Sequence, residues 1–140
     1  MSADPKKIFK ISMSERCYRF KPDALVSHAP PRPGVYEFVT FDAAKNPVVL
    51  YVGLALDRGV SAALGEHFSG KAKPAAEELF AVSKDIYFDY VAWADVGSIE
   101  DLKDIAGALI AKHRPKLNPP EVPSSGRYAE VAVEEVETIS

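Results

Sequence analysis

The chain has 140 residues with 47% hydrophobic content, a formal net charge of −3 at pH 7 and a pI near 5.6. This length suits one domain with a substantial core and argues against a second domain. The net negative charge gives no general attraction to nucleic acid, so any DNA contact must use a local basic patch.

No run of about twenty apolar residues is present, and the largely polar first ten residues contain no apolar segment of signal-peptide length. We therefore expect a cytoplasmic protein with no membrane span and no secretory signal. The single cysteine, Cys17, can form neither an internal disulfide nor a thiolate metal cluster, which fits a reducing compartment.

We expect residues 1–29 to form an N-terminal extension of the domain. Apolar and polar residues alternate over residues 8–13, which predicts a short strand. Lys21-Pro22-Asp23 predicts the start of a helical turn that continues through Val26. Three nearby prolines then interrupt regular structure ahead of Gly34.

The middle of the chain predicts a hairpin, two helices and a further strand. β-Branched and aromatic residues over 35–41 and 48–52, separated by a polar turn, predict the hairpin. A one-sided apolar stripe predicts a helix from Val60 to Phe68, and Lys73-Pro74 predicts a second helix with the proline at its first position. Alternation over residues 86–93 predicts a third strand, in the centre of the sheet.

The C-terminal part predicts one long helix that is capped by Ser98 and ended by Pro115, with acidic residues in its first turn. We expect residues 121–140 to form a tail or an edge strand. Within them, residues 128–136 alternate as a strand does, whereas the glutamates there suit a solvated segment. The order of elements predicts an α+β fold, in which helices cover a small sheet.

Three short motifs carry a resemblance to a known family. They are Pro33-Gly34-Val35-Tyr36, Leu50-Tyr51-Val52-Gly53 and Arg114-Pro115-Lys116-Leu117-Asn118. In this combination and order they resemble the motif set of the GIY-YIG nucleases. The resemblance implies that residues 30–120 form a GIY-YIG-like domain, with a β-β-α-β-α core and a small mixed or antiparallel sheet flanked by helices.

The resemblance also implies roles for single residues. Tyr36 and Tyr51 match the two motif tyrosines and His67 a histidine near the end of the first helix, so these three are the candidate catalytic residues. Gly34 and Gly53 match structural glycines. In such an endonuclease a phenol relays a proton, an arginine neutralises developing charge and a carboxylate holds a divalent metal, here expected to be Mg²⁺.

The chain departs from the family at two positions that carry charge. The arginine expected on the first helix falls on residues 61–63, which are Ser-Ala-Ala, and the metal-binding glutamate falls on Ala106. We therefore expect phosphodiester cleavage to be impaired or lost. An active nuclease with relocated groups, such as Arg58, Glu66 or Asp104, remains an alternative.

Each candidate also has a structural interpretation. Tyr36 and Tyr51 could be ordinary sheet aromatics, and His67 a satisfied histidine on an apolar helix face. The two motif glycines could permit a turn or a close helix approach. The residues themselves show no metal-ligand spacing, so the Mg²⁺ expectation comes from the resemblance alone.

The partner is the remaining question. For DNA, the candidate substrate-binding residues carry cationic or amide side chains: Arg58, Lys112, Arg114, Lys116 and Asn118. Lys103, on the same predicted helix as Lys112, is a further candidate for a phosphate contact. Cations at the end of a helix also stabilise its dipole, and Asn118 could brace the turn that follows. An alternative function is a binding module for nucleic acid or protein that uses the former active-site groove, and the acidic net charge favours a protein partner.

Overall fold

The computed structural model describes residues 4–136. Within them the strands and helices are β1 (Asp4–Met13), β2 (Tyr18–Arg19), α1 (Pro22–His28), β3 (Gly34–Phe41), β4 (Pro47–Ala55), α2 (Val60–Ser69), α3 (Ala76–Val82), β5 (Tyr87–Ala94), α4 (Ile99–His113) and β6 (Tyr128–Glu135). The predicted α+β class is confirmed, as are the hairpin, the helix after it and the long last helix.

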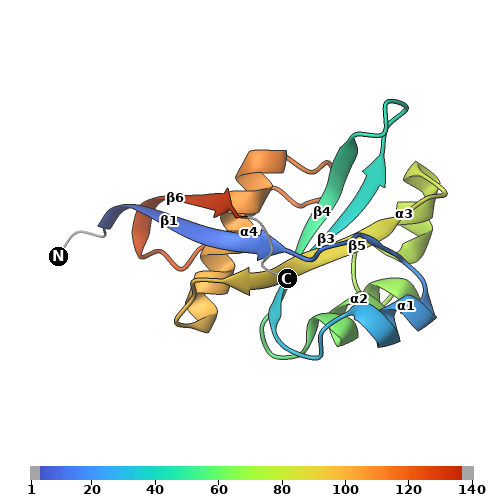
Figure 1. Ribbon diagram of the computed structural model, residues 1–140, viewed down its shortest axis with the longest axis horizontal. Coiled ribbons are helices and arrows are strands. Elements are labelled where there is room, and N and C mark those ends of the chain that lie inside the picture. Colours follow the sequence, from blue (N-terminus) through green and yellow to red (C-terminus); the bar gives the residue numbers. More distant parts are fainter. Residues whose placement is uncertain (1–3, 137–140) are drawn as a thin grey trace.

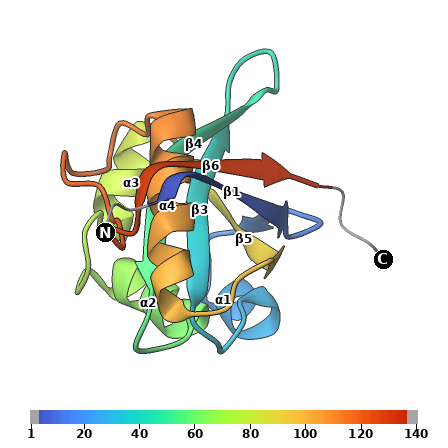
Figure 2. The same cartoon turned by 90° about the vertical axis from the view of Figure 1, so that its left-hand side faces the viewer.

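The strands form one mixed, curled sheet in the order β4-β3-β5-β1-β6, and β2 pairs with β5 outside this path. β3 pairs antiparallel with β4 and with β5, and β5 pairs antiparallel with β1. β6 runs parallel to β1, and the two lie side by side in both views (Figures 1 and 2). The prediction that β5 lies in the centre of the sheet is therefore confirmed.

Apolar side chains pack on both faces of the β3–β4 hairpin. On one face Tyr36 and Phe38 pack in a core that includes residues of α1, α2 and α3. On the other face Val35 and Val52 pack against α4, in a second core. Helix α4 accordingly lies apart from the other three helices, towards β1 and β6 (Figure 1). Side chains of consecutive hairpin residues thus enter different cores.

The third helix begins later than its sequence predicts. α3 begins at Ala76 with Ala75 as its N-cap, so the expectation that Pro74 takes the first helical position is wrong. The carboxylate of Glu78 accepts hydrogen bonds from the backbone N–H of Ala75 at 3.3 Å and from Nζ of Lys73 at 3.0 Å. These bonds satisfy the helix start, which lies two residues beyond the proline.

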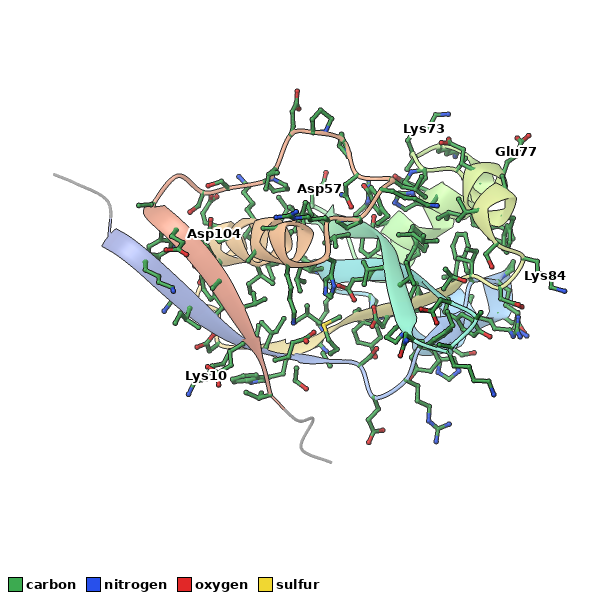
Figure 3. All side chains as sticks on the ribbon, turned by 90° about the horizontal axis from the view of Figure 1, so that it is seen from above. Lys10, Asp57, Lys73, Glu77, Lys84 and Asp104 are labelled. Atoms are coloured by element: carbon green, nitrogen blue, oxygen red, sulfur yellow. The ribbon has the colours of Figure 1, made fainter. Side chains whose placement is uncertain are left out.

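Residues 128–135 form an edge strand, so the solvated-tail interpretation is wrong for them; Glu137 lies outside the described residues. The approach to this strand is held against α4 by Arg127, whose guanidinium pairs with Asp101 and with Asp104 at 2.9 Å. Ser125 donates to Asp104 from both its backbone N–H and its hydroxyl. Asp104 projects from α4 towards this segment (Figure 3).

Within residues 4–136, no helix has both the length and the apolar character needed to cross a bilayer.

Candidate functional site

The hairpin register brings the two motif tyrosines together. Tyr36 lies opposite Gly53, and Phe38 lies opposite Tyr51. Because side chains two residues apart on a strand share a face, Tyr36 and Tyr51 are diagonal neighbours on the face covered by α2. This is the arrangement that the two motifs predict.

Gly53 makes room for the ring of Tyr36. A Cβ atom at position 53 would overlap Cζ, Cε2 and the hydroxyl oxygen of Tyr36. At Gly34, a Cβ atom would lie 3.2 Å from Cγ2 of Val60, the first residue of α2. Gly53 therefore lets the Tyr36 ring lie across β4, and Gly34 lets α2 approach β3 closely.

His67 joins the tyrosines from α2. Its Nε2 lies 2.7 Å from the hydroxyl oxygen of Tyr36, and its Nδ1 lies 2.9 Å from the carbonyl oxygen of Pro74. A carbonyl can only accept, so Nδ1 carries a proton and donates to Pro74. Neutral His67 then accepts a hydrogen bond from the hydroxyl of Tyr36 at Nε2.

Both members of this pair are buried and uncharged at neutral pH. Tyr36 is 2% exposed and so is His67. Burial raises the pKa of the Tyr36 phenol, and burial lowers the pKa of the His67 imidazole. The Tyr36 hydroxyl is therefore protonated and donates its hydrogen bond to His67. Because both side chains are buried, a substrate cannot reach this hydroxyl.

Tyr51 lies nearer to solvent, with its ring centroid 5.4 Å from that of His67. Burial raises the pKa of its phenol. Beside the cluster, Nη1 of Arg58 pairs with Oε1 of Glu66 at 3.0 Å, and both side chains are about one-third exposed (39% and 35%). The charges of Arg58 and Glu66 shift the pKa values of Tyr36 and His67 in opposite directions: Arg58 lowers both and Glu66 raises both.

The two positions where charge is expected lie on different faces of the sheet. Ala63 is fully buried in the core around Tyr36, whereas Ala106 is 1% exposed in the core beneath α4. Among the described residues, no group of three or more His, Cys, Asp or Glu side chains is arranged to hold a metal ion. The residues present do not fit the magnesium site that the family resemblance implies.

Asn118 binds backbone. Its Oδ1 accepts a hydrogen bond from the N–H of Val52 at 2.8 Å, and its Nδ2 donates to the carbonyl oxygen of Val52 at 3.0 Å. The N–H of Leu117 donates to the carbonyl oxygen of Leu50 at 3.1 Å. Residues 117–118 thus bond to β4 as a short extra strand would, and both polar groups of the Asn118 amide are used.

The basic residues of the last helix do not form one cluster of free charges. Lys103 pairs with Glu100 at 3.4 Å, and Lys112 pairs with Glu135 at 2.8 Å. Arg114 and Lys116 instead line a shallow hollow of about 400 Å³ beside β4. Of these four residues, only Arg114 and Lys116 could contact a phosphate without the loss of an ion pair that the structure contains.

The structure also contains a polar cluster that the sequence analysis missed. Glu37, on the face of β3 opposite to Tyr36, is 3% exposed and lies directly across from Asp89 of β5. Burial, together with the neighbouring Asp89, holds the pKa of Glu37 well above its ordinary value, and burial raises the pKa of Asp89 to about 6. The negative charge of Asp89 thus favours the protonated form of Glu37.

Two further titratable groups complete this carboxyl cluster. Nε2 of His113 lies 3.7 Å from Oε2 of Glu37, and Sγ of Cys17 lies 3.9 Å from Oδ2 of Asp89. Burial raises the pKa of Cys17 to about 12, with the Asp89 charge adding to the effect. The thiol is consequently protonated and unreactive at neutral pH.

One sequence signal could have revealed Glu37. The residues that share its strand face, Val35 and Val39, are apolar and buried, so the strand is covered on both sides. A carboxylate in the centre of such a strand has to be buried.

No protein-family model matches this chain, and no curated protein or solved structure matches it either.

Proposed function

We propose that this chain is a GIY-YIG-like domain that retains the tyrosine pair of the family but does not cleave phosphodiesters, and that it acts as a binding module. The antiparallel order β4-β3-β5, with helices after the hairpin and after β5, supports a β-β-α-β-α core of this type. The convergence of Tyr36, Tyr51 and His67 supports the motif assignment.

The observation that carries the loss of cleavage is the burial of Tyr36. Its hydroxyl donates to His67, which is itself held by the Pro74 carbonyl, and neither side chain is accessible to a phosphate or an attacking water. The family's glutamate position falls on Ala106, and its arginine position falls within residues 61–63, none of which is cationic. Loss of a single preorganised donor for transition-state charge commonly reduces a rate by about 10²–10³, and here two charged groups are missing.

A cleavage assay tests this proposal. The full chain is incubated with supercoiled and branched DNA in Mg²⁺ and in Mn²⁺, and nicking is followed on gels. We expect no cleavage above the metal-only background. Metal-dependent nicking that is lost in a Tyr51→Phe variant would overturn the proposal.

One observation favours a second candidate, an active nuclease with relocated groups. Arg58 and Glu66 place a cation and a carboxylate beside the tyrosine pair, and both are partly exposed. If they act in catalysis, cleavage should disappear in Glu66→Gln and persist in the control Glu77→Gln, which alters an exposed glutamate of α3. Equal activity of these two variants would exclude Glu66.

A further inference from the structure

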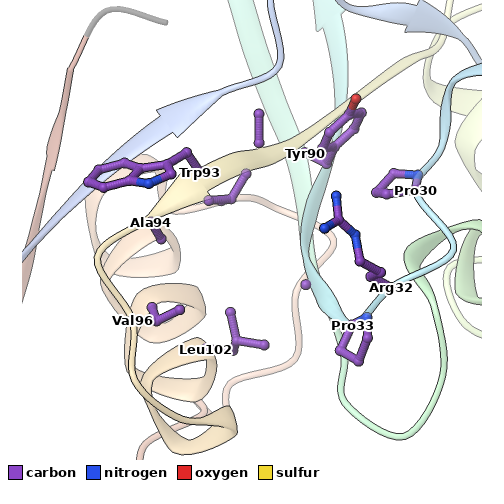
Figure 4. A pocket seen from close by; sticks show the side chains of 11 residues that line it. Pro30, Arg32, Pro33, Tyr90, Trp93, Ala94, Val96 and Leu102 are labelled. Carbon is purple, nitrogen blue, oxygen red and sulfur yellow. The ribbon is translucent and has the colours of Figure 1, made fainter. Parts of the chain in front are cut away.

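An opening separates β3 from β5 at the start of β3. β5 pairs with β3 from Tyr87 to Tyr90 and then leaves it to pair with β1. The space between the diverging strands has a volume of about 290 Å³ (Figure 4). Ligand pockets for drug-sized molecules begin at about 300 Å³, so this opening suits one planar group rather than a larger ligand.

A strand irregularity places two aromatic residues of β5 on the same face of the sheet. The β1–β5 register passes from Met13 opposite Val91 to Ser12 opposite Trp93, which leaves Ala92 as an extra residue. Without such a bulge, side chains at positions 90 and 93 would point to opposite faces. With it, both Tyr90 and Trp93 lie on the face away from α4, and the Trp93 side chain is 53% exposed.

Arg32 supplies the single charge of the opening. It is the one charged side chain among the lining residues, and it runs alongside Tyr90 (Figure 4). Within residues 4–136, its guanidinium takes part in no ion pair. Burial raises the pKa of the Tyr90 phenol, and the nearby charge of Arg32 opposes that rise. An exposed cation therefore sits beside the Tyr90 ring without an ion-pair partner in the described chain, and the indole of Trp93 lies at the other end of the opening (Figure 4).

We propose that this opening binds single-stranded nucleic acid, with Arg32 on a phosphate and a base stacked on the exposed indole of Trp93. Arginine beside aromatic rings is the combination by which single strands are bound without sequence preference. A base inside a duplex cannot offer its face to Trp93, so the unpaired form is the ligand.

This inference rests on the proposed binding role but not on the proposed loss of cleavage. Nucleic acid fits better than an acidic peptide, because a peptide carboxylate would satisfy Arg32 without using the exposed indole face. The acidic net charge of the protein limits the affinity, so binding should be detectable at low salt and fall as salt is added.

The intrinsic fluorescence of the protein provides the measurement, because Trp93 is the only tryptophan of the chain. The full chain is titrated at low salt with oligo(dT) of about ten nucleotides, a length within the roughly 4–16 nucleotides that single-strand binding domains cover. We expect saturable quenching by the oligonucleotide, and none by a duplex of equal length. Quenching by an acidic peptide but not by oligo(dT) would overturn the inference in favour of a protein ligand.

Variants locate the site by the anisotropy of a labelled oligonucleotide. Trp93→Ala should weaken binding by roughly 5- to 150-fold, the range that corresponds to loss of one stacked base, while Trp93→Phe should retain most of it. Arg32→Ala should weaken binding and reduce the log–log salt slope by about 0.7. The matched control is Lys84→Ala, which removes one positive charge from a residue that does not line the opening. Lys84 lies at the opposite end of the molecule from Lys10 (Figure 3).

Thermal melts of each variant verify that it is folded. Unchanged affinity in both Arg32→Ala and Trp93→Ala would overturn the proposed site, and so would an equal loss in Lys84→Ala. Absence of oligonucleotide binding refutes the single-strand inference without restoring cleavage. Metal-dependent cleavage by the wild type refutes the proposed function without bearing on Trp93, so the two failures are distinguishable.

Discussion

The hydroxyl of Tyr36 donates to Nε2 of His67 at 2.7 Å, and both residues are 2% exposed. Because the other imidazole nitrogen donates to the Pro74 carbonyl, this bond fixes the tautomer of the histidine and the orientation of the phenol. It links the first strand of the hairpin to α2 and to the segment ahead of α3. A pair of residues that resembles a catalytic constellation therefore has a clear structural role.

Tyr36→Phe should destabilise the fold, because it leaves Nε2 of His67 buried without a donor. The expected loss in the free energy of unfolding is about 1–3 kcal/mol. Tyr51→Phe is the matched control: its hydroxyl has no hydrogen bond within residues 4–136, so we expect a change within about 0.5 kcal/mol. Urea denaturation measures both, and equal stability of the two variants would contradict the role of the Tyr36–His67 bond.

Gly53→Ala should also be destabilising, since the added methyl group would overlap the Tyr36 ring. Overpacking of this kind costs about 1–3 kcal/mol. Gly65→Ala provides the comparison: nothing lies within 4 Å of a Cβ at that position on α2, and alanine there should stabilise the helix by about 0.5–1 kcal/mol. Thermal denaturation should therefore shift in opposite directions for the two variants.

The buried carboxyl pair predicts that stability declines with rising pH. Glu37 and Asp89 have pKa values above their unfolded values, so between the two sets of values the folded chain binds more protons than the unfolded chain. The free energy of unfolding should then fall from about pH 4, through the Asp89 pKa of about 6, towards the higher pKa of Glu37. Glu37→Gln should remove much of this decline.

Urea denaturation at several pH values from acidic to mildly alkaline checks this prediction. Glu100→Gln, a change at an exposed first-turn residue of α4, serves as the control and should keep the wild-type pH dependence. The groups that face Glu37 from other elements are Asp89, Cys17, His113 and the Lys112–Glu135 ion pair. Parallel pH profiles for wild type and Glu37→Gln would show that the carboxyl pair does not titrate in this way.

Restoring the expected charges by Ala63→Arg together with Ala106→Glu should not produce a nuclease. The two positions lie in separate cores on opposite faces of the sheet, so the new groups could not converge. Each substitution would bury an unpaired charge, and the unfolding free energy should fall by several kcal/mol. A folded double variant with metal-dependent cleavage would contradict the assignment of these positions to different cores.

Much of the fold follows from local pattern. The β3–β4 hairpin, the central β5 and the capped α4 have strong alternation or a clear helical stripe, and the structure contains all three. α3 starts later than its sequence predicts because Glu78 satisfies the N–H of Ala75, one residue after the proline. Side-chain bonds of this kind can move a helix end without changing its apolar pattern.

The site is only partly predictable for a different reason. Tyr36, Tyr51 and His67 come together because hairpin register and helix spacing are local rules. The pairing of Glu37 with Asp89 depends on which strand lies beside β3, a long-range choice that alternation does not specify. The bonds of Asn118 to β4 depend likewise on where the chain returns after α4.

Nuclear magnetic resonance of the histidine ring nitrogens can report directly on the closed state of the Tyr36 site. Long-range proton–nitrogen spectra of the full chain, with His67 assigned by a His67→Gln variant, are recorded over a pH series. We expect neutral His67 with its proton on Nδ1 at neutral pH, and a pKa below the ordinary histidine value because the ring is buried. A His67 that carries its proton on Nε2, or that titrates at or above the ordinary value, would contradict a sealed Tyr36–His67 pair.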